Sequence, residues 1–287
     1  MIAKFMPGIA GLALALAASP VHAQDDAART GRWADGTEFR FHRYVNFWRQ
    51  SPPGTTLGET ADERAPGRVL PALLSTDGRP IPAAERALFE RKARIALDAL
   101  LAQPSLRDPH GYAVRPRIMI SRDRFGRLSA TLSIYAPRIR LANPQTTNVA
   151  GRYYTPDEAP ELRVRINHGQ LWLNETPVRR GRYNGALTGE AKGEPFFHVA
   201  TNGRDPFIAT CCDYKGRPQD DWNPNFYDPA RPGSEIQYVS GMVIYDNHRR
   251  DALWNGTSPP DGPVPRLLAA LFMTDWTDVT RRMSAAR

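Results

Sequence analysis

Residues 117–135 read RIMISRDRFGRLSATLSIY, and this stretch decides the fold that we expect. Within it, residues 128–135 alternate apolar with polar side chains, which is the period of a β-strand that buries one face. Residues 117–122 are a second β-rich run, and Asp123 and Gly126 between the two runs are typical of a turn. The stretch therefore predicts two antiparallel strands joined by a short loop.

More strands are expected towards the C-terminus. We expect residues 162–166 to pair with residues 171–173 in a second hairpin, and residues 196–200 to pair with residues 207–211 in a third. Residues 238–245 are one more predicted strand. Successive hairpins, without alternation of strands and helices, indicate an antiparallel sheet rather than a Rossmann-type fold.

Helices are expected before and after these strands. Pro82 precedes a run with apolar residues at helical spacing and Pro104 ends that run, so a helix is predicted between them. After the last strand, residues 265–273 are a short apolar helix, and Asp275 caps a final basic helix. The predicted fold class is α+β, with an antiparallel sheet of hairpins flanked by an N-terminal helix and short C-terminal helices.

The first 23 residues, 1–23, have the three parts of a cleavable signal peptide. Lys4 supplies a positive charge, residues 9–18 are an apolar run, and Pro20 ends that run shortly before the small residue Ala23. The apolar run has ten residues, whereas a helix needs about twenty to span a bilayer. We therefore expect cleavage near Ala23 and export to the periplasm or the medium; an N-terminal membrane anchor is the alternative.

The rest of the chain divides into two parts. Residues 24–82 contain an aromatic segment, residues 37–50, through which either a strand or a short helix can be drawn, followed by a connection rich in Pro and Gly. Residues 83–287 carry the other predicted elements, and we expect them to form a single α+β domain. The longest later apolar run, residues 267–273, is too short to span a membrane.

The charge balance favours anionic partners. The chain has 38 Lys and Arg residues against 30 Asp and Glu residues, and its formal net charge is +8. Nearly all the cations are arginine, whose guanidinium group binds carboxylates and phosphates bidentately. A GC-rich genome, which enriches Arg, Ala, Pro and Gly together, is the alternative explanation. Because the arginines are spread along the chain, we expect an anionic envelope component or an exported protein as partner, and no nucleic acid.

The two cysteines, Cys211 and Cys212, are adjacent in the sequence. Export to an oxidising compartment favours a disulfide bond, although adjacent Cα atoms lie closer together than an unstrained disulfide requires. A vicinal disulfide bond is therefore one prediction. The alternatives are a buried thiol beside an idle exposed one, and pairing with another molecule.

The loop predicted over residues 213–235 contains oxygen-bearing side chains at alternate positions. Asp221, Asn223 and Asn225 are of the type that binds Ca²⁺, which is the one cofactor that we consider. The surrounding residues do not follow the EF-hand pattern. The alternative is that these side chains stabilise turns through their own hydrogen bonds.

No catalytic motif is present, so the sequence identifies no catalytic residue and favours a binding protein over an enzyme. The histidines form no zinc-binding pair, and no serine lies in a nucleophile elbow. We expect an anionic glycan or protein to contact loop residues that carry charge or a flat ring: Arg217, Trp222, Tyr227 and Trp254. Rings that only cap the core are the alternative. Two other function classes stay open, a cell-envelope hydrolase with dispersed carboxylates and an inhibitor-like partner of another exported protein.

Overall fold

The computed structural model describes most of the chain beyond residue 30. The described residues are 31–33, 36–168, 178–184, 186–191, 194–212, 216, 218–246 and 250–287. The expected signal peptide, residues 1–23, lies outside them, so its cleavage stays a prediction.

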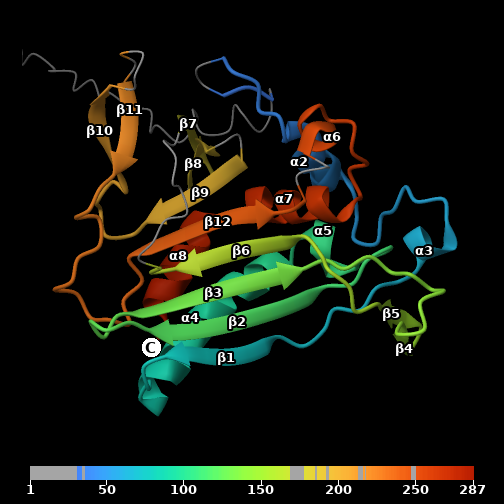
Figure 1. The fold of residues 1–287 in the computed structure, drawn as a ribbon, viewed down its shortest axis with the longest axis horizontal. Coiled ribbons are helices and arrows are strands. Elements are labelled where there is room, and N and C mark those ends of the chain that lie inside the picture. Colours follow the sequence, from blue (N-terminus) through green and yellow to red (C-terminus); the bar gives the residue numbers. More distant parts are fainter. Residues whose placement is uncertain are drawn as a thin grey trace, which may run out of the picture.

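In the described part of the chain, eight strands form one sheet in the order β1-β2-β3-β6-β12-β9-β8-β7, and two short pairs stand apart from it (Figure 1). β1 runs parallel to β2, and the other strand pairs are antiparallel. The strands are β1 (Leu73–Gly78), β2 (Arg115–Arg122), β3 (Leu128–Tyr135), β4 (Thr147–Val149), β5 (Arg152–Tyr154), β6 (Glu161–Ile166), β7 (Val178–Tyr183), β8 (Ala186–Ala191), β9 (Glu194–Ala200), β10 (Phe207–Cys212), β11 (Pro218–Trp222) and β12 (Tyr238–Ile244).

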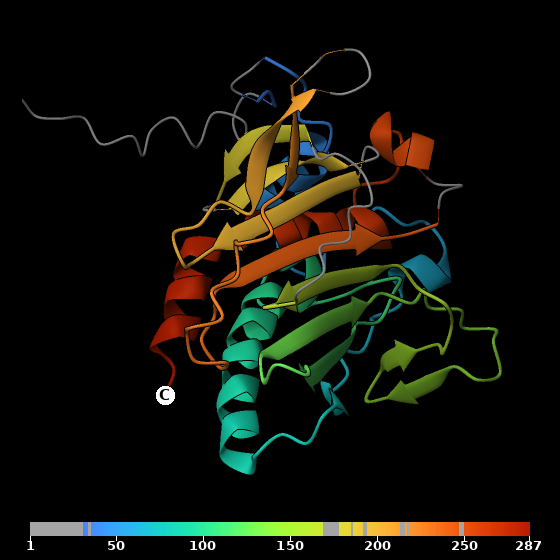
Figure 2. The ribbon, with the colours of Figure 1, turned by 60° about the vertical axis from the view of Figure 1, so that its left-hand side comes forward.

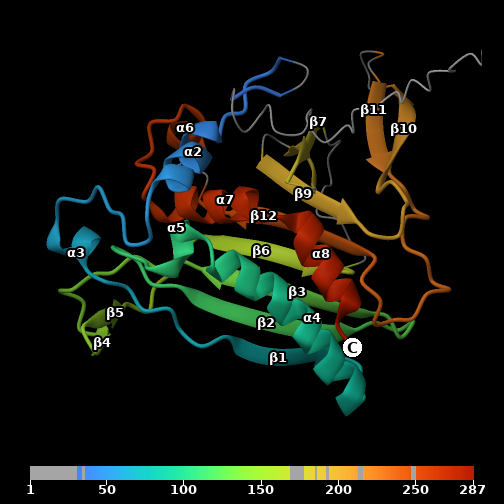
Figure 3. The same cartoon turned by 180° about the vertical axis from the view of Figure 1, so that it is seen from behind.

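Helices cover one face of the eight-stranded sheet. α4 packs on β2 and β3, α7 on β6 and β12, and α8 on β9. Figure 3 shows these helices in front of the sheet, and Figure 2 shows α4 and α8 side by side. The helices are α2 (His42–Gln50), α3 (Ala61–Arg64), α4 (Ala83–Leu101), α5 (Pro104–Arg107), α6 (Arg250–Trp254), α7 (Pro263–Met273) and α8 (Trp276–Ala285). The chain therefore has an α+β fold with a large, mostly antiparallel sheet.

The hairpin predicted from residues 117–135 is confirmed. β2 and β3 pair in antiparallel register, with Ile118 opposite Leu132 and Ile120 opposite Ala130. These four side chains are buried under α4, because alternate residues of a strand point to the same face.

The predicted partner of residues 162–166 is wrong. These residues lie in β6, whose two edges are occupied by β3 and β12 over its whole length. Residues 171–173 lie outside the described residues. A strand pattern predicts which face is buried, but it does not predict which strands are neighbours.

The third predicted hairpin is also wrong. Residues 196–200 lie in β9, between β8 and β12, whereas residues 207–211 lie in β10, which pairs with β11 outside the main sheet. β11 lies within residues 213–235, which we expected to be a loop. Its sequence, PQDDW, has a proline and two aspartates, so strand propensity gives no signal there.

The other predicted elements agree with the structure. α4 follows Pro82 at its N-cap position and ends before Pro104, and β12 matches the strand predicted over residues 238–245. α7 is the predicted apolar helix, and the Asp275 side chain caps α8 by accepting a hydrogen bond from the Asp278 N–H at 2.9 Å.

α7 lies very close to the sheet at Gly241 of β12. A Cβ atom at this glycine would lie 2.7 Å from Leu271 Cδ1 and 3.6 Å from Val164 Cγ2. Since a larger side chain would collide with the helix, the absence of a Cβ sets the distance between these two layers.

The segment 24–82 contributes to the same core. The open choice over residues 37–50 is settled as a helix, α2, which packs on α7. Phe39 and Tyr44 belong to the same buried cluster as the sheet residues, and β1 adds an edge strand within the predicted connection. Among the described residues, no helix is long and apolar enough to cross a membrane.

Candidate functional site

The face of the sheet opposite α4, α7 and α8 carries a group of arginines. We call this face the open face. Along each strand, every second side chain points to the helices, and the side chains between them point to the open face. On β2, β3, β6 and β12 these side chains are Arg115, Arg117, Met119, Ser121, Ser129, Thr131, Ser133, Tyr135, Glu161, Arg163, Arg165, Tyr238, Ser240, Met242 and Ile244. Four of them are arginines, and Glu161 is the one acidic residue in these four strands.

The strand register sets the spacing of the arginines. Arg117 of β2 and Arg163 of β6 lie on either side of Ser133 of β3, in one row across the sheet. Two strand spacings separate them, which is about 10 Å between Cα atoms. Arg165 lies in the next row, about 7 Å along β6 from Arg163. The cationic groups are therefore arranged over an area, not gathered at one point.

Glu161 holds Arg163 in place. This carboxylate is 5% exposed, and it accepts hydrogen bonds from Ser133 Oγ at 2.6 Å and from Arg163 Nε at 2.6 Å. Arg163 Nη2 makes a second contact with the other carboxylate oxygen. A bidentate contact of this kind fixes the plane of the guanidinium group.

Arg165 is half-buried beside Arg163, in a place that disfavours its positive charge. Burial, together with the like charge of Arg163, lowers the pKa of Arg165 to about 10. An anion placed between these side chains would reduce both effects, since it compensates the charge and replaces lost water contacts.

Arg115 and Arg117 lie on the more accessible side of the open face. The Arg115 guanidinium lies 4.8 Å above the Tyr135 ring and donates to the Tyr154 hydroxyl at 3.3 Å. Arg117 is exposed and donates a long hydrogen bond, 3.4 Å, to Ser75 Oγ of β1. Neither guanidinium forms an ion pair with a carboxylate in the part of the chain that the structure describes, so both keep hydrogen-bonding capacity for a ligand.

The open face is covered at its β9 end. His198 of β9 is 3% exposed and stacks on Tyr238, with ring centroids 5.5 Å apart, while Phe207 lies against its edge. Phe226 packs on the same tyrosine. Burial lowers the pKa of His198 to about 3, so this histidine is neutral at neutral pH. The uncovered part of the open face is therefore that of β2, β3 and β6.

Two of the predicted ligand-binding residues, Tyr227 and Trp254, lie apart in the structure. Tyr227 lies under Arg127, whose guanidinium is 4.4 Å from its ring, and burial raises the pKa of this tyrosine to about 12. Trp254 ends α6, at the opposite end of the sheet from the β2–β3 turn that carries Arg127 (Figure 1).

Trp254 is half-buried between two arginines, Arg40 at 4.6 Å and Arg250 at 4.8 Å from its ring. Its ring faces are thus already in contact with the protein itself. Arg217 and the side chain of Trp222 lie outside the described residues, so their part in binding stays a prediction.

The predicted calcium ligands are only partly described. Asn223 donates from its side chain to the Asp205 carbonyl at 2.8 Å and accepts from the Asn225 N–H at 3.0 Å, which is the turn role left open as the alternative. The side chain of Asp221 is outside the described residues. Within the part of the chain that the structure describes, no three His, Cys, Asp or Glu side chains gather into a metal site.

Cys212 is exposed at the end of β10. The side chain of Cys211 is outside the described residues. The vicinal disulfide bond therefore stays a prediction for the oxidised protein.

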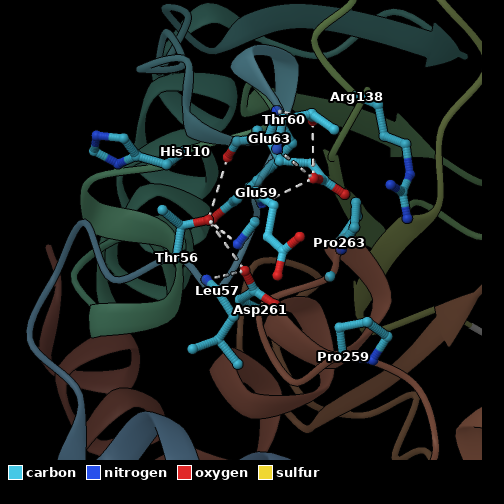
Figure 4. Close-up of a pocket in the computed structure, with 14 residues that line it drawn as sticks. Thr56, Leu57, Glu59, Thr60, Glu63, His110, Arg138, Pro259, Asp261 and Pro263 are labelled. Atoms are coloured by element: carbon cyan, nitrogen blue, oxygen red, sulfur yellow. Dashed lines mark hydrogen bonds between the residues drawn. The ribbon is translucent and has the colours of Figure 1, made fainter.

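A cleft lies at the end of the sheet, beside the start of α7. It consists of two adjoining cavities of about 350 Å³ and about 550 Å³, which share Arg138, Pro259, Gly262 and Pro263 as lining residues. The smaller cavity, shown in Figure 4, lies between the loop of residues 56–63 and α7.

Arg266 of α7 fastens the loop before α3 to this cleft. Its side chain is fully buried between the rings of Trp48, 4.3 Å away, and Tyr112, 4.7 Å away. The guanidinium donates to the carbonyls of Asp261 at 2.6 Å and Thr55 at 2.7 Å. The cleft wall is therefore held by a buried cation that donates to two backbone carbonyls and, at 3.3 Å, to the Tyr112 hydroxyl.

The carboxylates of the smaller cavity are not arranged as an acid–base pair. Asp261 accepts from the Leu57 N–H at 2.6 Å and from Thr56 Oγ1 at 3.1 Å, so it anchors the loop. Glu63 completes a capping box with Thr60, and these hydrogen bonds lower the pKa of its carboxyl group. A general acid needs a raised pKa, which neither of these roles supplies.

Sequence reasoning missed the open face as a site. The signal was present, because Arg163 and Arg165 occupy the polar positions of an alternating strand, as do Arg115 and Arg117. That the two pairs share one face depends on β3 lying between β2 and β6, which the sequence does not reveal. Comparison of the chain with known protein families, curated proteins and solved structures found no match.

Proposed function

We propose that the protein is an exported binding protein whose open face binds a polyanionic chain, with an acidic glycan of the cell envelope as the first candidate. The observation that carries the proposal is the excess of four arginines over two carboxylates, Glu161 and Asp77, on the open face of β1, β2, β3, β6 and β12. Export is inferred from residues 1–23.

The spacing of the arginines favours a chain over a single small anion. The guanidinium groups of Arg115, Arg117 and Arg163 bind separate partners in the fold, so they do not converge on one phosphate or carboxylate. An extended polymer with repeated charges meets several of them at once, and repeated weak contacts raise the overall affinity.

The other side chains of the open face favour a glycan over an acidic protein. Ser129, Thr131 and Tyr135 lie on the same face as the arginines and offer hydroxyl groups that exchange hydrogen bonds with sugar hydroxyls. Large apolar side chains, which anchor protein interfaces, are few on this face. On β2, β3, β6 and β12 they are Met119, Met242 and Ile244.

The proposal is tested by isothermal titration with three probes, an octamer of galacturonic acid, the neutral octamer maltooctaose, and octaglutamate. We expect saturable binding of the galacturonate octamer, weaker binding of octaglutamate, and none of maltooctaose. Binding should weaken as the salt concentration rises from roughly 0.05 M to 0.5 M, because salt screens exposed charges. Preference for octaglutamate would move the function to an acidic protein partner.

The double variant Arg115→Gln, Arg117→Gln should weaken binding of the galacturonate octamer roughly two- to thirtyfold, since each exposed ion pair contributes about 0.2–1 kcal/mol. The control is Arg86→Gln, Arg94→Gln on α4, which removes the same charge from the opposite side of the sheet. Equal loss in both double variants would show that net charge alone attracts the glycan, and the site would be abandoned.

A further inference from the structure

The cleft at the end of the sheet has a composition opposite to that of the open face. Its two cavities are lined by six carboxylates and two arginines, in a chain whose net charge is +8. The carboxylates are those of Glu59, Glu63, Asp157, Glu158, Asp246 and Asp261, and the arginines are Arg138 and Arg140.

Segments far apart in the sequence build this cleft. The larger cavity lies between the loop of residues 157–160, the end of β12 and the residues that lead from α6 into α7. Its volume of about 550 Å³ falls in the range of small-molecule sites, which is about 300–1,000 Å³. Part of its lining is apolar and comes from Ala159, Pro160, Ile244, Leu253, Val264 and Pro265.

Four of the carboxylates interact with other parts of the fold. Asp261 and Glu63 hold the loop of residues 56–63, as described above, Asp157 pairs with Arg140 at 3.1 Å, and Asp246 also has a partner. The carboxylates of Glu59 and Glu158 accept no hydrogen bond from the described residues, and both side chains are exposed. Figure 4 shows the Glu59 carboxylate pointing into the smaller cavity.

The start of α7 offers little to an anion, although a helix N-terminus usually attracts one. Pro263 and Pro265 have no N–H group, and the Gly262 N–H donates to the Pro259 carbonyl at 3.0 Å. Among residues 262–265, Val264 is then the one whose N–H is left for a ligand. The helix therefore does not offset the negative charge of the lining.

We infer that this cleft binds a small organic cation, in which an amine or guanidinium group is attached to an apolar body. The apolar body packs in the larger cavity against Pro160, Leu253 and Val264. The cationic group pairs with the exposed carboxylates of the lining, Glu158 in the larger cavity and Glu59 in the smaller one. The site is separate from the open face, so it does not rest on the polyanion proposal.

The probe is phenethylamine, with 2-phenylethanol as its neutral counterpart, and binding is measured by ligand-observed NMR on the full mature chain. N-acetyl-Phe-Arg-amide tests whether the same chemistry is recognised in a peptide, with N-acetyl-Phe-Gln-amide as its neutral counterpart. We expect saturable binding of a cationic probe and at least threefold weaker binding of its neutral counterpart. Binding of the arginine peptide alone would assign the cleft to basic peptides, and binding of phenethylamine alone would assign it to free amines.

The variants are Glu59→Gln and Glu158→Gln, which remove charge without removing a hydrogen bond that holds the fold. Each should weaken cation binding roughly two- to fivefold, as expected for partly exposed ion pairs. The control is Glu85→Gln, Asp98→Asn on α4, outside the cleft lining. Equal affinity for charged and neutral probes, no saturable binding, or unchanged affinity in both glutamate variants would overturn the inference.

Discussion

Replacing His198 with phenylalanine should make the stability of the protein less sensitive to acid. His198 lies on β9 with its ring stacked on Tyr238 and in contact with Phe196 and Phe207, and burial lowers its pKa to about 3. In the unfolded chain a histidine has a pKa of about 6.5. Between these values the unfolded chain binds one more proton than the folded chain, so acid stabilises the unfolded state.

The size of the effect follows from that difference. The free energy of unfolding falls progressively as the pH drops below 6.5, by roughly 2–3 kcal/mol at pH 4.5. The contribution is fully lost only when the pH approaches the folded pKa of about 3. Phenylalanine has a similar ring but no proton to bind, so His198→Phe removes this slope while it preserves most of the packing.

Urea unfolding at about pH 7 and about pH 4.5 measures the effect. The wild type should lose roughly 2–3 kcal/mol more than His198→Phe between these two pH values. Phe196→Leu is the control, since it disturbs the same cluster but removes no titrating group, and it should keep the wild-type slope. If the wild type and His198→Phe lose the same free energy, His198 is hydrated or charged in the folded protein and the reasoning fails.

Three further substitutions test the packing that shapes the sheet and the cleft. Arg266→Met should lower the free energy of unfolding by about 3 kcal/mol, because two backbone carbonyls lose their donor. Calorimetry should then show a Tm that is lower by roughly 6–12 °C, and an unchanged Tm would contradict this prediction. Gly241→Val should lower the free energy of unfolding, measured with urea, by about 1–3 kcal/mol. Adding Leu271→Ala to the same chain should recover part of that loss, whereas additive losses would show that the introduced valine and the Leu271 side chain do not collide. Asp275→Ala should lower the free energy of unfolding by about 1 kcal/mol, because α8 loses its N-cap. If Asp278→Ala lowers it by the same amount, the effect comes from negative charge near the helix N-terminus and not from the cap.

The parts of the fold that depend on local signals were predictable. Prolines at 82 and 104 bracket α4, and the alternation in residues 128–135 identifies the buried face of β3. These signals lie within a single element, so they do not depend on where the chain goes next.

Strand order was not predictable from the same signals. Residues 162–166 have the right period for a strand, but β3 and β12 are equally suitable neighbours for them, and both pair with β6. For the same reason the loop residues Tyr227 and Trp254 were expected in one site, although they pack on arginines at opposite ends of the sheet.

Arginine footprinting with the galacturonate octamer tests the central claim most directly. The protein is treated with phenylglyoxal in the presence and absence of the octamer, and modified arginines are identified by mass spectrometry. Our account predicts that the octamer protects Arg115 and Arg117 on the open face and leaves Arg86 and Arg94 on α4 as reactive as before. Protection of the α4 arginines to the same extent, or of no arginine on β2, would contradict it.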